Sequence, residues 1–142
     1  MKNELSKKNS YWLPKERYLE LVHFSRGYKS LVEKLYDIWG VGSTSIVDCS
    51  AQKNCLADPS SDAAIRARYL EDKIDAIELA ANRCGEGLMF YIIRNVAEGI
   101  SYDKMNAYGR VPCGRRQFYE ARRRYFWLLD QILMGNANAH IM

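Results

Sequence analysis

The sequence lacks the residue patterns on which most catalytic sites depend. Its 142 residues contain only two histidines, His23 and His140. It has no Gly-x-Ser-x-Gly, no His-Glu-x-x-His and no phosphate-binding loop. The carboxylates are scattered along amphipathic segments, where they suit solvated helix faces, and His23 lies in such a segment, where a structural role is the simpler interpretation. We therefore expect a protein that is not an enzyme and that needs no cofactor.

Cysteine is also sparse, and the four thiols do not form a metal-binding pattern. No Cys-x-x-Cys pair occurs, and the histidines lie far from the cysteines in the sequence, whereas zinc ligands are usually closely spaced. Cys49 and Cys55 are near enough for a disulfide or for half of a metal site. Ordinary reduced thiols are the simpler interpretation, so the sequence predicts no metal site.

Long apolar runs are missing as well. No stretch approaches the ~20 apolar residues of a membrane span. The polar start, Met1–Lys8, has no hydrophobic segment behind it, which is unlike a secretory signal. We expect a cytoplasmic protein without membrane segments, whose residues 1 to about 12 form a polar arm that frays or touches DNA backbone.

Positive charge is concentrated in one part of the chain. The formal net charge is only +4. The window Arg110–Arg124 holds six arginines and one acid, Glu120, a net charge of +5, so that the rest of the chain is close to −1. Such asymmetry indicates a local electrostatic footprint of the kind that nucleic-acid-binding proteins carry.

The stretch Gly99–Leu129 has the layout of a helix-turn-helix. Ser101 can cap a short helix over about 102–108, and Gly109 can supply the positive φ of a sharp exit. Pro112 then breaks the chain firmly.

A second helix is predicted to follow at about 114–130. Gly114 can serve as its N-cap, and Gln117 can reach back to the cap as in a capping box. Its apolar positions are spaced to form one buried stripe, and they are Phe118, Ala121, Tyr125, Leu128, Leu129 and Ile132.

The side chains off this stripe suit DNA. Arginine has a planar fork that fits phosphate and the guanine edge, and glutamine can pair with adenine. The N-terminal end of the second helix normally enters the major groove. We predict that six residues face bases or flanking phosphates: Arg115, Arg116, Gln117, Tyr119, Glu120 and Arg123. Five others are predicted mainly to hold the DNA backbone: Arg110, Arg122, Arg124, Tyr102 and Lys104. The alternative is an ordinary core helix with a solvated basic face.

Two resemblances support this hypothesis. Residues Leu88 to Leu129 are similar in layout to region four of bacterial sigma factors, with an apolar helix, Glu98-Gly99-Ile100-Ser101-Tyr102, a short helix, a turn and a basic helix. Residues 11 to 133 resemble the ArpU/RinA-type phage transcriptional regulators. The matching pieces are Leu13-Pro14-Lys15-Glu16-Arg17-Tyr18, Asp58-Pro59, Val111-Pro112-Cys113-Gly114-Arg115, Phe118-Tyr119, Arg122-Arg123 and Tyr125-Phe126. The resemblance implies a regulator of phage or prophage genes, in the first place an activator, in a bacterial host cell.

The upstream part reads as two long helices. The first runs from Pro14 to about Trp39, interrupted at Gly27, and a linker over 40–59 follows. The second starts at Ser60 or Ser61, ends near Cys84, and carries a heptad seam of Ala63, Ala67, Leu70, Ile74, Ile77 and Ala81. The seam predicts either an antiparallel hairpin of helices 14–39 and 61–84 or a homo-oligomer in which two chains share it.

The expected architecture is therefore all-α. Residues 1–84 form the hairpin or oligomerisation region, 85–133 a three-helix DNA-binding domain, and 134–142 a flexible tail. Leu88–Ala97 is interpreted as the buried first helix of that domain. A strand is the alternative there, because Tyr91-Ile92-Ile93 favours β structure.

Two other functions fit the same pattern. A protein-interaction module could bind RNA polymerase or a phage protein through Tyr125-Phe126-Trp127 as an aromatic anchor. A small DNA-recognition subunit of a phage packaging terminase also has a helix-turn-helix and oligomerising helices. The proposed partner in the main hypothesis is double-stranded DNA.

Overall fold

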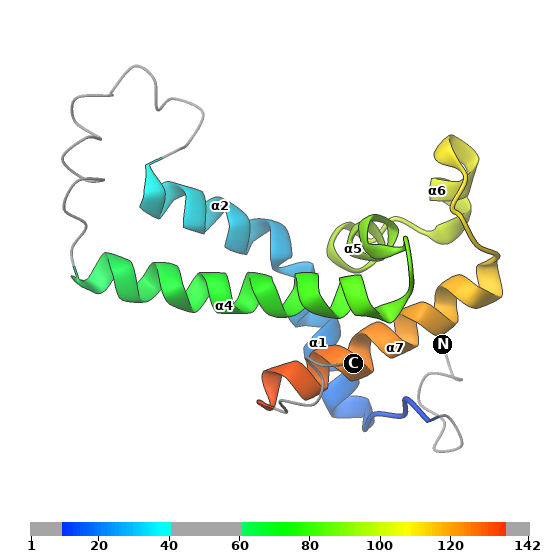
Figure 1. Cartoon of the computed structure of the whole chain (residues 1–142), viewed down its shortest axis with the longest axis horizontal. Helices are drawn as coiled ribbons and strands as arrows, with labels where there is room; N and C mark the ends of the chain where they lie inside the picture. The colour runs from blue at the N-terminus through cyan, green and yellow to red at the C-terminus, as the bar shows by residue number, and fades with distance from the viewer. Residues whose placement is uncertain (1–9, 41–60, 136–142) are drawn as a thin grey trace. The chain divides into compact units, whose positions relative to one another are not determined.

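The computed structural model describes residues 10–40 and 61–135, and all the regular elements in these ranges are helices (Figure 1). The all-α class predicted from the sequence is confirmed for this part of the chain. The helices are α1 (Lys15–Arg26), α2 (Tyr28–Trp39), α4 (Ser61–Cys84), α5 (Met89–Glu98), α6 (Tyr102–Gly109) and α7 (Arg115–Leu133).

Several expectations fall on residues outside the described ranges. They concern the pair Cys49 and Cys55, the linker from residue 41 onward, the arm before residue 10, and the tail from residue 136. Within the described ranges, every helix is too short or too polar to span a lipid bilayer.

The predicted first helix is in fact two helices, which meet at Gly27. The backbone N–H of Gly27 lies 3.1 Å from the carbonyl oxygen of Phe24, so α1 closes there with a tightened last turn. Pro14 precedes α1 as its N-cap, with φ −57° and ψ 146°, rather than forming its first residue. The chain divides at the same point into two compact units, one of residues 1–27 and 76–142 and the other of residues 28–75.

In the unit of residues 28–75, α2 packs along the first part of α4 (Figure 1). Helix α1 is placed in the other unit, so the predicted hairpin of helices 14–39 and 61–84 is not confirmed as a whole. Packing apolar side chains of two helices against each other is what stabilises such a pair. The buried cluster is Leu35, Ala67, Leu70 and Ile74, with Tyr28, Leu31, Val32 and Ile38 partly buried against it.

Five of the six seam positions of α4 are buried within the single chain, and Ala63 is half-buried. Ala67, Leu70 and Ile74 are buried in the unit of α2, and Ile77 and Ala81 are buried in the other unit. The apolar positions of the seam follow one another in alternating steps of four and three residues. Packing inside one chain is enough to explain this spacing.

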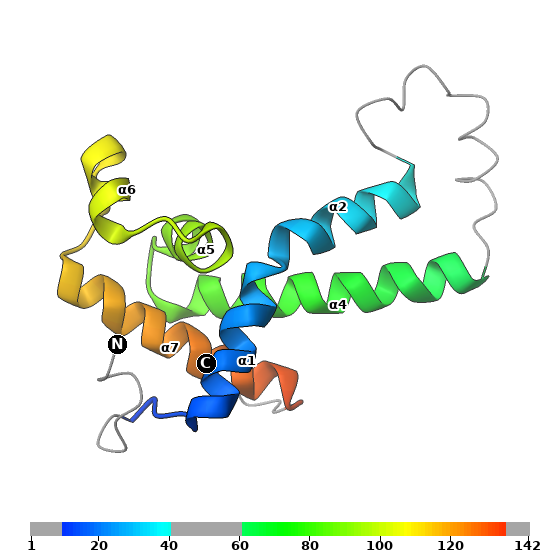
Figure 2. The same ribbon diagram turned by 180° about the vertical axis from the view of Figure 1, so that it is seen from behind.

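The other unit is built around α7, which α1, α5 and α6 all contact (Figure 2). The buried stripe predicted for α7 is confirmed at Phe118, Ala121, Tyr125, Leu128 and Leu129, and Ile132 is half-buried. Phe126 is fully buried as well, which the stripe did not include. Its ring packs edge-on against the ring of Tyr18 from α1, with centroids 5.2 Å apart.

One polar contact lies in this core. The hydroxyl oxygens of Ser25 and Tyr125 are 2.8 Å apart, and both side chains are fully buried. A buried hydroxyl is costly unless it has a hydrogen-bond partner. The pair therefore fixes how α1 lies on α7.

The segment 88–97 is a helix, as expected, and not a strand. Leu88, Ile92 and Val96 are buried on one side of it, a spacing of four residues that matches helical periodicity. The expectation of a fully buried helix is wrong at Phe90, however, because its side chain is 61% exposed.

Candidate nucleic-acid interface

Helix α6 begins as the sequence predicted and ends one residue later. The Oγ of Ser101 accepts a hydrogen bond from the backbone N–H of Lys104 at 3.2 Å, which is the expected cap. The positive φ lies at Arg110, with φ 53°, and Gly109 remains helical. The prediction that Gly109 makes the exit is therefore wrong.

The physical reason is a side-chain bond that sequence patterns do not reveal. The Oδ1 of Asn106 accepts from the backbone N–H of Val111 at 3.0 Å, and the backbone carbonyl of Asn106 accepts from Arg110. The two bonds close the turn one residue beyond the glycine. Such positive-φ conformations are uncommon for residues with a side chain.

The turn is also attached to α6 by Tyr102. Its hydroxyl donates to the carbonyl oxygen of Cys113 at 2.8 Å, and its ring centroid lies 5.4 Å from that of Phe118. Tyr102 is only 8% exposed. The hydroxyl is used inside the protein to position the start of α7, and a contact of Tyr102 with the DNA backbone stays a prediction.

The start of α7 leaves its first amide groups open. Gly114 is the N-cap, with φ −74° and ψ 165°, and its N–H donates to the Oε1 of Gln117 at 3.3 Å, as the capping-box prediction required. Glycine has no side chain that could accept a hydrogen bond from the first amides of the helix, so α7 has no side-chain cap hydrogen bond. The N–H groups of the first turn are therefore available to an acceptor from outside.

Two arginines occupy this end of α7. Arg115 and Arg116 have side chains 63% and 93% exposed, and no acidic residue lies in the first turn. A helix N-terminus carries a partial positive charge, so cations are disfavoured there by about 0.3–1 kcal/mol each. The arrangement costs stability, and it concentrates positive potential at one point on the surface.

Neighbouring carboxylates hold these arginines in place. The Nη1 of Arg115 lies 3.0 Å from the Oδ2 of Asp103 on α6, and its guanidinium lies 5.8 Å from the ring centroid of Tyr119. The Nε of Arg116 lies 3.8 Å from Glu120. These are exposed pairs, which contribute at most about 1 kcal/mol each and can be exchanged for another anion.

Arg122 is half-buried and bonds two neighbouring helices. Its Nε donates to the Oδ1 of Asn95 at 2.7 Å, and its Nη1 donates to the hydroxyl of Tyr18 at 3.0 Å. Its guanidinium also lies 4.9 Å from the ring centroid of Phe126. Its donors join α7 to α1 and α5, and a contact of Arg122 with the DNA backbone stays a prediction.

The remaining basic residues differ in their exposure. Arg110 and Lys104 are exposed. Arg123 has a side chain only 15% exposed, with Nη2 3.9 Å from Glu120. Arg124 is half-buried and lines a small pocket of about 340 Å³ together with Cys84 and other residues. The six arginines of the window therefore do not form one continuous exposed face.

The thiols near this end are not activated. Burial raises the pKa of Cys84 to about 12, although the positive charge of Arg124 acts in the opposite direction. Partial burial also raises the pKa of Cys113. Within the described ranges, no group of three or more His, Cys, Asp or Glu side chains could hold a metal ion.

Three residues of this region escaped the sequence analysis: Asp103, which pairs with Arg115, Asn106, which closes the turn, and Asn95, which holds Arg122. Asp103 lies in the first turn of α6, where an acid is common for reasons of helix polarity alone. Its ion pair with Arg115 joins residues twelve positions apart, which no local pattern reveals.

Comparisons with known proteins leave the family open: no protein-family model matches the chain, no curated protein matches it, and no solved structure matches it.

Proposed function

We propose that this protein is a sequence-specific DNA-binding transcriptional regulator of phage or prophage genes, acting as an activator. Helices α5, α6 and α7 form its helix-turn-helix domain, and the N-terminal end of α7 enters the major groove of double-stranded DNA. Helix α6 lies behind it and carries the turn.

The observation that carries the proposal is the chemistry of the first turn of α7. Arg115, Arg116 and Gln117 are exposed together, on a turn that contains no acid and whose amides lack a side-chain cap. Arginine can pair with both acceptors of guanine, and glutamine with adenine. Open amides at a helix N-terminus bind phosphate oxygen.

The rigid attachment of this turn supports the same function. A base-reading helix must be held in one orientation, because a misplaced side chain loses its bidentate geometry. The hydroxyl of Tyr102 and the amide side chain of Asn106 both bond the turn that leads into α7. The fully buried side chain of Phe118 packs α7 against the core.

The proposal assigns a narrower set of contacts than the sequence did. Arg115, Arg116 and Gln117 read base edges, and Arg110, Tyr119 and Arg123 hold flanking phosphates. Glu120 lies within 4 Å of both Arg116 and Arg123, so it limits their mobility before DNA arrives. An acid at this position can also accept from cytosine.

A binding titration with the full chain tests the proposal. Labelled fragments of phage and host DNA are titrated at several salt concentrations, and bound fragments are selected and sequenced. We expect an enriched sequence and an association constant whose logarithm falls linearly with the logarithm of salt, with a slope of about −0.9 per phosphate contacted.

Arg116→Ala should weaken binding to the selected site by about tenfold or more. Arg68→Ala is the matched control, since Arg68 on α4 is also highly exposed, at 78%, and is also paired with an acid four residues away. Both changes remove one positive charge. Equal losses of DNA affinity in the two variants, or no DNA binding by the wild type at low salt, would overturn the proposal.

A further inference from the structure

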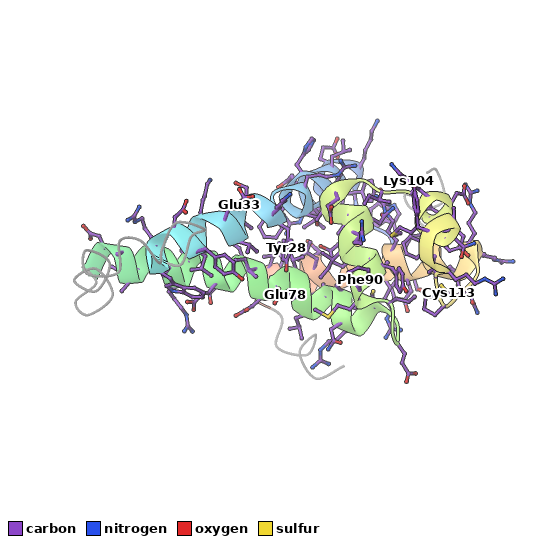
Figure 3. The ribbon with its side chains drawn as sticks, turned by 90° about the horizontal axis from the view of Figure 1, so that it is seen from above. Tyr28, Glu33, Glu78, Phe90, Lys104 and Cys113 are labelled. Carbon is purple, nitrogen blue, oxygen red and sulfur yellow. The ribbon has the colours of Figure 1, made fainter. Side chains whose placement is uncertain are left out.

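A groove with a volume of about 440 Å³ lies between α5 and α6. Its apolar walls are formed by Phe90 from α5, Ile100 from the connecting segment, and Met105 and Tyr108 from α6. Figure 3 shows Phe90 and Lys104 on the two helices that border it.

Two aromatic rings of this groove are left uncovered. Phe90 is 61% exposed and Tyr108 is 85% exposed, and they come from opposite walls. Single exposed apolar residues are common on protein surfaces, but paired aromatic walls around a hollow are typical of sites that receive a bulky side chain. The sequence had suggested Tyr125-Phe126-Trp127 as an aromatic anchor for a partner. Tyr125 and Phe126 are fully buried, so these two rings are not on the surface.

The fixed charges of the groove all have the same sign. Arg94 and Lys104 line it, and no carboxylate does. The guanidinium of Arg94 lies 5.4 Å from the ring centroid of Phe90, which keeps it beside the apolar wall.

Arg94 also carries a polar group without a partner. Its Nε atom is buried and makes no hydrogen bond within the part of the chain that the structure describes. A buried donor without a partner is destabilising. An incoming carboxylate would be the strongest acceptor for this guanidinium.

We propose that this groove is a docking site for a short amphipathic helix of a partner protein, with acidic residues beside its apolar face. A bulky apolar side chain of that helix enters between Phe90 and Tyr108, and its carboxylates pair with Arg94 and Lys104. Helix-in-groove recognition places the apolar anchors of one helical face into a hydrophobic groove, and here the apolar walls and the two cations beside them match such a face and its acidic edge.

The charge pattern favours this occupant over others. A nucleic acid would also find two cations, but the groove offers it no acidic or amide side chain to read a base edge. The inference does not depend on DNA binding, because the groove lies between α5 and α6 and the proposed DNA contacts lie on α7 and the turn. Lys104 is therefore reassigned from the DNA backbone to this site.

The test uses the full chain and synthetic helical peptides of about four turns. Each peptide carries Leu, Phe or Trp as the central anchor, with glutamates along the edges of its apolar face. Two sister peptides replace those glutamates by glutamine and by lysine. Binding is measured by fluorescence anisotropy, and the occupied residues are identified by NMR chemical-shift changes.

We expect an acidic peptide to bind about tenfold or more tightly than its glutamine version, and the lysine version not to bind. Arg94→Gln should remove that charge preference, and Tyr108→Ala should weaken the acidic peptide without changing the fold, because Tyr108 is largely exposed. Tyr69→Ala, which changes a 62% exposed aromatic on α4, is the matched control and should have no effect.

Several results would overturn the proposal. They are no saturable binding of any acidic peptide, equal binding of the lysine version, and insensitivity to Tyr108→Ala. Preferential binding of an oligothymidine that Phe90→Ala abolishes would assign the groove to single-stranded nucleic acid instead. Self-association that Phe90→Ala abolishes would assign it to a second copy of the chain.

Discussion

The guanidinium of Arg115 at the start of α7 is paired with the carboxylate of Asp103 on α6, with 3.0 Å between Nη1 and Oδ2. Both side chains are about two-thirds exposed. In the proposed complex, a phosphate or a base edge competes with Asp103 for the same guanidinium. The pair therefore weakens binding to any DNA that does not offer a better partner, which favours specificity over affinity.

Removing this competitor should increase non-specific binding. We expect Asp103→Asn to bind random double-stranded DNA several-fold more tightly, since an exposed ion pair is worth up to about 1 kcal/mol. The salt dependence should steepen by up to about 0.9 in logarithmic slope, because one more phosphate contact forms.

Asp72→Asn is the control for the change in charge. Asp72 is exposed and pairs with Arg68 on α4, away from the proposed DNA surface. If both variants raise non-specific affinity equally, net charge alone is responsible and the role given to Asp103 is wrong.

Arg122 should contribute to stability, unlike Arg116. Arg122→Ala removes two hydrogen bonds to Asn95 and Tyr18, and bonds that involve a charged group contribute about 1.5–3 kcal/mol each. Arg116→Ala affects a 93% exposed side chain and should change the free energy of unfolding by less than about 0.5 kcal/mol. Urea denaturation of the two variants measures both values, and equal losses would contradict the structural role of Arg122.

The buried hydroxyl pair of Ser25 and Tyr125 predicts a coupled loss. Tyr125→Phe leaves the Ser25 hydroxyl buried without this partner, which should destabilise the protein by about 1–3 kcal/mol. The double variant with Ser25→Ala should lose less than the sum of the two single changes, because both polar groups are then gone. Strict additivity in a double-mutant cycle would mean that the two hydroxyls do not interact.

The thiol of Cys84 should make stability fall at alkaline pH. Its pKa is raised by burial from 9.0 to about 12 in the folded protein. The folded state therefore holds the proton more tightly, so the contribution is fully present below pH 9 and is lost as the pH rises toward 12.

Comparing the wild type with Cys84→Ala isolates this contribution, since all other titrating groups are common to both proteins. The wild type should lose more stability than the variant between pH 9 and the upper limit of folding. Alkylation of Cys84 at pH 8 should be about a thousandfold slower than that of an ordinary thiol. Rapid alkylation of the folded protein would contradict the burial.

Local sequence rules predicted much of this fold. The cap at Ser101, the hydrogen bond that Gly114 donates to Gln117 and the buried stripe of α7 all depend on residues within a few positions of one another. Such short-range patterns are visible in the sequence, because the backbone geometry of a helix fixes which neighbours meet.

The features that the sequence did not predict depend instead on contacts between residues that local patterns do not link. Arg122 and Arg116 are alike in type and both lie on α7, yet Asn95 and Tyr18 draw only Arg122 inward. Helix α6 ends after Gly109, with the positive φ at Arg110, because the side chain of Asn106 accepts a hydrogen bond from the backbone N–H of Val111. No helical periodicity encodes either relationship, so neither could be predicted from the sequence.

Base reading by Arg116 is tested most directly by a matrix of affinities. The selected DNA site is changed one base pair at a time, and each version is titrated with the wild type and with Arg116→Ala at fixed salt. We predict that the wild type discriminates at one position by about 1–3 kcal/mol and that the variant loses the preference there alone. A uniform weakening across all versions of the site would contradict insertion of α7 into the major groove.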